Sequence, residues 1–592
     1  MRRAGIQVCR FVRRPGLRKA VVRSRSALFT PNHAVTARAL STRRGSANTQ
    51  ALQSSMQLKS FSVALVSSAV AAGAWYSWKE ANNASPLENS PTSAVGTVED
   101  AAEATRRALV IQQDQLYLTT IPEGTPLSKT QNGLGTQVLE MLSPEQATQK
   151  LRTNEESWLI GRGKGVVRYD VVQIPSNPII EDDHAEKIIE VPPSIASPAD
   201  GSTTSDWMFW GVFDGHSGWV TSAKLRESLI SFVARELNST YKSALADPSL
   251  KYPSPQAIDA AIKTGFVRLD NEIVNTSVQK ALKETSKSVA VQLLQPALSG
   301  SCGLLSFYDS ASSTLRVACT GDSRAVLGRR SPSSGKWIAE ALSIDQTGGT
   351  PSEDARLRAE HPNEPDVTRN GRILGGLEPS RAFGDAVYKW SAETQRQMKK
   401  FFGRTPSSLF KTPPYVTAEP VVTTTKVEPG RGDFVVMATD GLWEMLTNDE
   451  VVGLVGQWLD AQAEGKNGDQ SQSWLKSWWS TSKQAGLPVE KNGAGDGAGQ
   501  RAPVRQRQWG MEPGKDERFV VQDKNVATHL VRNALGGRDT DQVCALLTLP
   551  SPYSRRYRDD LTVEVIFFGE GGNGSVTLNK EATASPQEKA KL

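Results

Sequence analysis

Three aspartates each stand where an apolar run of this chain meets a turn. Asp214 ends the run in FWGVFDGHSG, Asp440 ends DFVVMATD, and Asp559 lies just before the run in DDLTVEVIFF. A carboxylate at the end of a buried strand is costly unless a cation meets it. The three are so far apart in sequence that only a folded domain could bring them together. We therefore interpret them as oxygen ligands that converge on hard divalent metal ions.

The cysteines and histidines favour no other kind of stabilising site. The four cysteines (Cys9, Cys302, Cys319 and Cys544) are widely spaced and form no CxxC pair, which argues against a disulfide framework. The five histidines form no HxxxH or HxH pair, which weakens a zinc site. With 592 residues, the chain can build two or three average domains, or one large domain with insertions and tails.

Positive charge is concentrated near the N-terminus. The net charge is +6, yet residues 1–79 contain 11 Arg, 3 Lys and no acidic residue, and the rest of the chain holds 55 basic against 63 acidic residues. A nucleic-acid-binding protein would carry basic residues on its folded part, so we expect no nucleic-acid partner. Residues 1–60 are typical of a mitochondrial targeting segment, with an ordinary basic tail as the alternative.

Residues 61–78 form an uncharged stretch, FSVALVSSAVAAGAWYSW, between Lys59 and Lys79. As a helix it would span about 27 Å, just enough for a bilayer core. We interpret it as a candidate transmembrane segment that would anchor the protein in the mitochondrial inner membrane. An extension of the cleavable presequence is the alternative. Residues 79–140 are polar and contain many Pro, Ser and Thr residues, which predicts a linker.

Folded structure is expected to begin near residue 141. Ser143, Pro144 and Gln146 form the start signal of a helix, with Ser143 and Gln146 as a capping box. After Asp206, short apolar strands occur in runs and do not alternate strictly with helices, which favours an α+β fold.

A single catalytic domain is expected over residues 141–568, with insertions near 187–205 and 465–514. The second insertion contains Trp474, Trp478 and Trp479, which could dock a partner or a membrane surface, or pack back onto the domain. Residues 569–592 are expected to form a disordered tail.

Residues near Asp214 and two further motifs extend the metal-site hypothesis. Asp214 can bridge two ions with its two oxygens, and Gly215 lets the backbone come close enough for its carbonyl to ligate as well. His216 would then stand beside the ions, suited to protonate a leaving group. Glu181 opens an acidic triplet, EDD, and Thr320–Arg324 lies between two strand-like runs, where it predicts a hairpin or only a turn.

Six motifs follow one another in a distinctive order: ED, DGHSG, GDSRAVL, LEPSRAFGD, ATDGLWE and RDDLTV. This succession resembles the type 2C metal-dependent serine/threonine protein phosphatases over approximately residues 140–568. SNPIIED, RLRAEHPNE, TPPYVTAEP and NVATHLVRNALGG are similar to the pyruvate dehydrogenase phosphatase branch of that family. The resemblance implies a central β-sandwich of two antiparallel sheets flanked by α-helices, with a two-metal site at one end.

The resemblance also implies roles for the motif residues. Asp214 would bridge two Mg²⁺ or Mn²⁺ ions, and His216 would be the general acid. The ligands implied for the two ions are Glu181 (directly or through water), Asp214, the Gly215 carbonyl, Asp440 and Asp559. Asp322 and Glu444 match positions that some members use for a third ion, although Glu444 replaces the more usual Asp. A metal-activated water would attack phosphoserine or phosphothreonine without a covalent enzyme intermediate.

Two positions depart from the family pattern. Asn177 stands where many members have an arginine that holds the substrate phosphate, and the pyruvate dehydrogenase phosphatase branch resembles this chain there. Phosphate binding would then depend more on the ions and their waters. Gln346 stands where a histidine is common, and the sequence assigns it no role. A pseudophosphatase scaffold is the non-enzymatic alternative, which the retained aspartates disfavour.

Substrate and location are linked. The resemblance implies a phosphoprotein substrate, with pyruvate dehydrogenase E1 alpha as the candidate. If residues 61–78 stayed in the inner membrane with their basic side in the matrix, the catalytic domain would face the intermembrane space and need another substrate. The chain ends in Ala590-Lys591-Leu592, which resembles a peroxisomal tripeptide. We therefore hypothesise dual mitochondrial and peroxisomal targeting.

Overall fold

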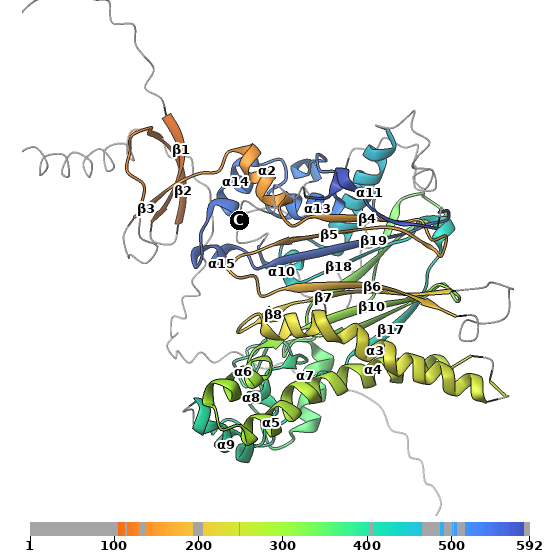
Figure 1. Ribbon diagram of the computed structural model, residues 1–592. Coiled ribbons are helices and arrows are strands. Elements are labelled where there is room, and N and C mark those ends of the chain that lie inside the picture. Colours follow the sequence, from red (N-terminus) through yellow and green to blue (C-terminus); the bar gives the residue numbers. More distant parts are fainter. Residues whose placement is uncertain are drawn as a thin grey trace, which may run out of the picture. The chain divides into compact units, whose positions relative to one another are not determined.

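Two antiparallel β-sheets lie face to face in the computed structural model (Figure 1). The five-stranded sheet has the order β17 (Val421–Lys426), β11 (Thr314–Thr320), β10 (Gly303–Asp309), β7 (Ser205–Phe213) and β6 (Asp183–Val191). The seven-stranded sheet has the order β13 (Trp337–Ala341), β12 (Arg324–Arg330), β18 (Phe434–Ala438), β19 (Leu561–Phe568), β5 (Val166–Ile174), β4 (Glu156–Ile160) and β20 (Val576–Leu578). Neighbouring strands in both sheets are antiparallel. The predicted α+β fold with a central β-sandwich is confirmed.

The structure describes most of the chain after residue 104. The described residues are 105–112, 115–128, 136–192, 205–247, 249–250, 252–402, 408–464, 486–490, 500, 503–505, 516–572 and 574–584. They belong to the unit of the chain that begins at Ser54.

Strand β7 shows how the sandwich is built. All nine of its residues are buried. Trp210 and Val212 face the core between the two sheets, whereas Phe209 and Phe213 face the core on the helical side of the five-stranded sheet. A strand covered on both faces needs apolar residues at nearly every position, and this explains the continuous apolar run before Asp214.

Helices cover the outer face of each sheet (Figure 1). Helices α3 (Val220–Ala246) and α4 (Pro255–Asn271) pack on each other, and α3 contacts β6 and β7 of the five-stranded sheet. Helices α11 (Asn448–Glu464) and α13 (Val526–Ala534) pack on the seven-stranded sheet. Further α-helices are α2 (Pro144–Arg152), α5 (Ser277–Lys283), α6 (Lys287–Leu298), α7 (Pro351–Glu360), α8 (Ala386–Lys389), α9 (Ala392–Phe402), α10 (Asp440–Trp443), α14 (Thr540–Thr548) and α15 (Tyr553–Tyr557).

A small three-stranded sheet lies beside the sandwich, in the order β16 (Phe383–Gly384), β9 (Gly300–Ser301) and β8 (Gly215–His216). A two-stranded sheet is formed by β14 (Thr368–Arg369) and β15 (Arg372–Ile373). Strand β8 of the three-stranded sheet begins directly after Asp214, so this sheet bears on the candidate site.

Helix α2 begins as the sequence predicts. Gln146 N donates to Ser143 Oγ at 3.2 Å, and Ser143 N donates to Gln146 Oε1 at 2.8 Å. The predicted capping box is confirmed.

Part of the predicted linker over residues 79–140 is folded, so this prediction is wrong. Strands β1 (Thr105–Gln112), β2 (Gln115–Pro122) and β3 (Gln137–Glu140) form an antiparallel sheet in the order β2-β1-β3. Leu109, Ile111 and Leu116 join the core on the helical side of the seven-stranded sheet. The polar average composition hides these apolar residues, which are spaced to place one face of the small sheet against that core.

Two other predicted boundaries are wrong as well. Residues 187–191 belong to β6, which pairs with β7 along its whole length, and not to an insertion. In the predicted C-terminal tail, β20 pairs with β4, and Ala584 N donates to Glu155 O at 3.0 Å. Without β20, strand β4 would be the edge of the sheet, with unpaired N–H and C=O groups. Pairing of β20 with these groups accounts for the folded segment up to Ala584.

The hairpin predicted at Thr320–Arg324 is wrong. Strand β11 ends at Thr320 in the five-stranded sheet, whereas β12 starts at Arg324 in the seven-stranded sheet. Gly321 has a φ of 110°, a conformation that favours glycine, and lets the chain cross from one sheet to the other. The crossing places Asp322 at the end of the sandwich.

None of the helices in the described part of the chain combines the length and the apolar character that a bilayer crossing requires. Four predicted features lie outside the described residues: the targeting segment (1–60), the candidate transmembrane segment (61–78), the three tryptophans at 474, 478 and 479, and the C-terminal tripeptide.

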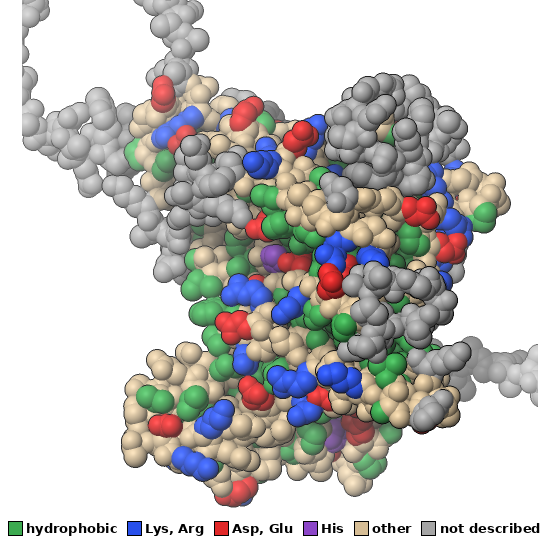
Figure 2. Space-filling view, turned by 45° about the vertical axis from the view of Figure 1, so that its right-hand side comes forward, with side chains coloured by type: hydrophobic (Ala, Val, Ile, Leu, Met, Phe, Trp, Pro, Cys, Tyr) green, Lys and Arg blue, Asp and Glu red, His purple; other side chains and the backbone are tan. Residues whose placement is uncertain are grey.

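On the face shown in Figure 2, basic and acidic side chains are intermixed, so charge of both signs is spread over it.

Candidate metal centre

Turns from both sheets bring three carboxylates together at one end of the sandwich. Asp214 follows β7, Asp322 lies in the crossing from β11 to β12, and Asp440 begins α10 after β18. One carboxylate oxygen from each of them can be chosen so that all lie within 4.8 Å of one another. The structure thus joins Asp214 and Asp440, two of the three aspartates that border apolar runs, and it adds Asp322.

The carboxylates in this group disfavour one another's charge. Burial, and then the charges of Asp440 and Asp182, hold the pKa of Asp214 well above its ordinary value. Burial also raises the pKa of Asp322 to about 6, although Cys302 Sγ donates a hydrogen bond to Asp322 Oδ1 at 3.1 Å. Clustered carboxylate oxygens with raised pKa values fit a hard divalent cation, which would favour their charged forms.

The glycine after each of two aspartates allows a close contact between loops. A Cβ atom at Gly215 would lie 2.0 Å from the carbonyl oxygen of Glu181, and one at Gly441 would lie 2.0 Å from the carbonyl oxygen of Asp560. Any other residue would push these loops apart. The two Asp-Gly pairs therefore set Asp214 and Asp440 against the acidic loops at 181–183 and 559–560.

Glu181 lies next to the group of three but is not part of it. Its Oε1 accepts a hydrogen bond from Gly218 N at 2.8 Å. Its own N–H donates to Asp560 Oδ2 at 2.8 Å. The side chain is thus directed to the loop after His216.

Asp182 is a functional candidate that was not assigned from the sequence. It is 4% exposed and accepts hydrogen bonds from the hydroxyls of Thr439 and Thr562, both at 2.9 Å. Burial, and then the charge of Asp560, raise its pKa to about 8. The EDD triplet contained the signal, but local sequence does not show which of three adjacent acids is buried.

Asp559 also lies outside the group of three. Its carboxylate forms an ion pair with Arg555 of α15. The adjacent Asp560 accepts hydrogen bonds from the N–H of Ser176 at 2.5 Å and from its hydroxyl at 2.7 Å. Asp560 therefore ties the segment before Glu181 to the segment that carries Asp559.

His216 is paired with Asp385, a second residue that was not predicted. His216 Nε2 lies 2.7 Å from Asp385 Oδ2. A Cβ atom at Gly300 would come within 2.1 Å of His216 Nε2 and 2.3 Å of Asp385 Oδ2. The two side chains therefore meet over Gly300 of β9, where there is no room for a Cβ atom.

Asp385 favours the protonated form of His216. Burial lowers the pKa of His216, but the charge of Asp385 and its hydrogen bond outweigh burial, so that the pKa is raised. An imidazolium held in this way can donate a proton. The LEPSRAFGD motif contains Asp385, yet its partner is 169 residues away in sequence, so the pairing could not be read from the motif.

Gln346 holds the loop that carries Asp322. Its Oε1 accepts a hydrogen bond from Gly321 N at 2.9 Å, and its Nε2 donates to Cys319 O at 3.0 Å. Gln346, to which the sequence assigned no role, therefore fixes the crossing from one sheet to the other.

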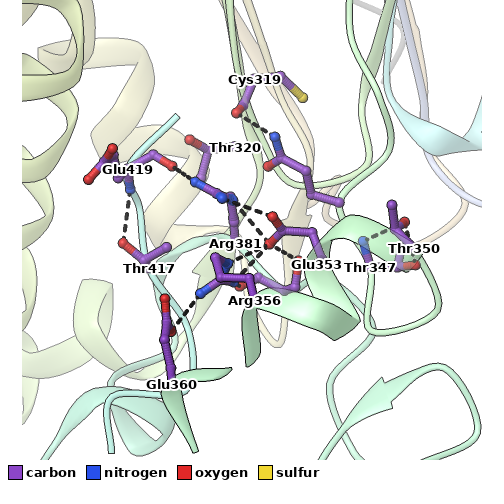
Figure 3. A network of polar contacts seen from close by, with 12 residues as sticks. Cys319, Thr320, Thr347, Thr350, Glu353, Arg356, Glu360, Arg381, Thr417 and Glu419 are labelled. Carbon is purple, nitrogen blue, oxygen red and sulfur yellow. Dashed lines mark hydrogen bonds and ion pairs between the residues drawn. The ribbon is translucent and has the colours of Figure 1, made fainter. Parts of the chain in front are cut away.

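Helix α7, which begins five residues after Gln346, is held by Glu353 (Figure 3). Arg381 Nη2 donates to Glu353 Oε1 at 2.8 Å, and Arg356 Nη2 donates to Glu353 Oε2 at 2.7 Å. Burial opposes the charge of Glu353, but the two guanidinium groups outweigh it and lower its pKa to about 2. The SRAFGD part of the motif thus supplies both a helix anchor, Arg381, and the partner of His216.

Comparison with known proteins identifies the family. The family model described as protein phosphatase 2C matches residues 185–471. A mitochondrial [pyruvate dehydrogenase [acetyl-transferring]]-phosphatase 1 from Saccharomyces cerevisiae is 43% identical over 485 residues, which span 79% of this chain and 81% of that relative. The chain belongs to the protein phosphatase 2C family. It is a protein serine/threonine phosphatase of the pyruvate dehydrogenase phosphatase-like branch, and the family is metal-dependent.

Two further relatives agree with this assignment. A protein phosphatase 2C homolog from Schizosaccharomyces pombe is 43% identical over 429 residues, 72% of this chain and 85% of the relative. The human protein named mitochondrial [pyruvate dehydrogenase [acetyl-transferring]]-phosphatase 1 is 29% identical over 496 residues, 72% of this chain and 83% of the relative. A crystal structure of a serine-threonine phosphatase 2C from Toxoplasma gondii is 18% identical, with a TM-score of 0.37, and covers 68% of this chain and 95% of that one.

In this phosphatase, Glu444 is bound by Arg505, which lies within the range predicted to be the second insertion. Arg505 Nε lies 2.9 Å from Glu444 Oε2, and Arg505 N donates to Glu444 O at 2.9 Å. Glu444 N donates to Asp440 O at 2.8 Å, so Glu444 follows Asp440 by one helical turn. Arg505 therefore contacts the residue that the resemblance assigns to a third ion.

Proposed function

We propose that this phosphatase binds two Mg²⁺ or Mn²⁺ ions through Glu181, Asp214, the Gly215 carbonyl, Asp440 and Asp559. The clustering of Asp214, Asp322 and Asp440 at the end of the sandwich carries the proposal, because it concentrates like charges that a cation would offset. Asp322 and Glu444 would serve a third ion. When bound, such ions lower the pKa of a water molecule and so supply a nucleophile at neutral pH.

The chain's own residues would supply the proton and the orientation. His216, with its pKa raised by Asp385, would donate a proton to the departing seryl or threonyl oxygen. Asp385 would hold the imidazole ring through the 2.7 Å hydrogen bond to Nε2. Asp182, bound by Thr439 and Thr562, would fix the loop that carries Glu181.

We further propose that the substrate is phosphorylated pyruvate dehydrogenase E1 alpha in mitochondria. Relatives that carry the name of a mitochondrial pyruvate dehydrogenase phosphatase are 43% and 29% identical, and the matches cover 81% and 83% of their lengths. The basic composition of residues 1–60 supports a mitochondrial destination. An anchor at residues 61–78 that faced the intermembrane space would demand a different substrate.

The substrate is tested with purified components. The protein should release phosphate from phosphorylated E1 alpha in the presence of Mn²⁺ or Mg²⁺, and EDTA should stop the release. Hydrolysis of a phosphoserine peptide without any release from E1 alpha would reject the substrate and leave the phosphatase intact.

The location is tested by protease protection of isolated mitochondria. Protection of the catalytic domain after rupture of the outer membrane would support access to the matrix enzyme, whereas digestion would support an anchor facing the intermembrane space. Deletion of Ala590-Lys591-Leu592 from a tagged protein should remove a peroxisomal fraction, and an unchanged distribution would reject that signal.

A further inference from the structure

Arg555 places a guanidinium group next to the candidate metal centre. It forms the ion pair with Asp559, and 41% of its side chain is exposed. This cation therefore lies beside an acidic segment of the site while still facing solvent.

Helix α15 fixes the position of Arg555. The Ser554 hydroxyl donates to the carbonyl oxygen of Ser176, and Ser554 is 1% exposed. The Ser551 hydroxyl donates to Asn177 Oδ1 at 3.3 Å. The helix is therefore fastened to the segment that leads into Glu181, and Asn177, an uncharged residue, lies at this contact.

The other two arginines in the SRRYRDD segment have different surroundings. Arg556 lies over the ring of Tyr553, 5.5 Å from the ring centre. Arg558 is 1% exposed, and burial lowers its pKa to about 10. Arg555 itself combines solvent exposure with contact to an acidic residue of the site.

A phosphate ester would meet strong repulsion from the carboxylates at this end of the sandwich. A guanidinium group carries five N–H donors in a planar fork, which suits two-point hydrogen bonding to phosphate oxygens. The ion pair with Asp559 leaves further donors of Arg555 for a second anion. We infer that Arg555 binds the phosphate group of the substrate and of the inorganic phosphate product, a role that Asn177 cannot fill. This inference rests on the proposed function, because it places the substrate at the same site.

The test uses the full-length protein loaded with Mn²⁺ and inorganic phosphate as the probe. Arg555→Ala should weaken binding of phosphate, measured by calorimetry, by about 10-fold or more, as expected for a lost charged hydrogen-bonding pair. The KM for a phosphoserine peptide should rise by a similar factor, and kcat should fall less. Arg555→Lys should recover part of the affinity, because it restores the charge but not the fork.

Two further variants sharpen the result. Arg556→Gln, which changes the neighbouring arginine on the same helix, should leave phosphate affinity and KM unchanged. The double variant Asn177→Arg with Arg555→Ala should regain phosphate affinity, since it returns a guanidinium group to the contact between α15 and the segment at 176–177.

A purely structural role for Arg555 gives a different pattern. If Arg555→Ala left phosphate affinity and KM unchanged and altered only Mn²⁺ affinity or the melting temperature, Arg555 would merely hold Asp559, and the inference would be overturned. Phosphate binding is measured without turnover, so failure of the wild-type protein to hydrolyse E1 alpha would reject the proposed substrate and not this role.

Discussion

The carboxylates at the candidate metal centre and Glu353 of helix α7 meet the cost of burial in opposite ways. Glu353 is 4% exposed, yet the guanidinium groups of Arg381 and Arg356 lower its pKa to about 2. Asp322 is 8% exposed, and burial raises its pKa to about 6. A buried acid that arginines compensate within the chain is part of the framework. The raised pKa of Asp322, together with its closeness to Asp214 and Asp440, instead supports a place where a cation from outside would bind.

The largest effect is expected for Asp440→Asn. Loss of a ligand carboxylate should reduce turnover of a phosphoserine peptide at saturating Mn²⁺ by about 1,000-fold. The metal-free variant should melt at the same temperature as the wild type or higher, because one repelling charge is removed. Retention of more than about a tenth of the activity would reject Asp440 as a ligand and break the comparison.

Glu353→Gln should have the opposite outcome. It leaves Arg381 and Arg356 without their shared carboxylate, which should lower the free energy of unfolding by about 3 kcal/mol. Turnover per folded molecule should stay close to wild type. Glu360→Gln is the matched control: Glu360 also pairs with Arg356 but is 49% exposed, so its loss should cost about 0–1 kcal/mol in chemical denaturation. Equal costs for the two variants would contradict the framework role of Glu353.

Asp385 is intermediate between these two kinds of buried acid. It has a partner within the chain, but that partner is His216, whose positive charge depends on pH. Asp385→Asn should slow hydrolysis of a phosphoserine peptide by about 10-fold and shift the loss of activity at high pH to lower pH, since the pKa of His216 would no longer be raised. An aryl phosphate, whose leaving group needs little protonation, should be affected much less. Equal losses on both substrates would remove His216 and Asp385 from the proton transfer.

The comparison also predicts an opposite pH dependence of stability in the metal-free protein. Asp182 has a folded pKa of about 8, above its ordinary value of 3.8, so its contribution is complete below pH 3.8 and is lost as the pH rises towards 8. Glu353 has a folded pKa of about 2, below its ordinary 4.5, so its contribution is complete above pH 4.5 and is lost as the pH falls towards 2.

Denaturation curves measured in EDTA across both ranges test this difference. Asp182→Asn should flatten the first slope, and Glu353→Gln should flatten the second. Saturating Mn²⁺ should suppress the first slope, because a cation favours the charged carboxylates. A slope that is unchanged in either variant would contradict the assignment of that group.

The parts of this molecule that depend on local signals could be predicted from the sequence. The capping box at Ser143 is written in four consecutive residues, and buried strands show as apolar runs that end where Asp214 and Asp440 stand. The crossing from β11 to β12 could not be predicted, because the same residues fit a hairpin and only the pairing of β12 with β18 decides between them. The roles of Glu181 and Asp559 as ligands stay predictions.

Residues whose partners are distant in sequence were also beyond prediction. The pairing of Asp385 with His216 needs the small sheet that brings β8 and β16 to either side of β9. The surroundings of Arg555 depend on how α15 docks onto Ser176. The LEPSRAFGD motif contains Asp385, and Arg555 stands three residues before the RDDLTV motif, but only the fold shows which atoms these two residues meet.

The three clustered aspartates come from both layers of the sandwich: Asp214 follows a strand of one sheet and Asp440 follows a strand of the other. An ion held between them would act as a cross-link between the sheets. The backbone amides at the ends of β7 and β18 should then exchange their hydrogens more slowly when Mn²⁺ is present, while those at the opposite end of the sandwich should change little. Metal supply would in this way set the rigidity of the catalytic end of the protein as well as its chemistry.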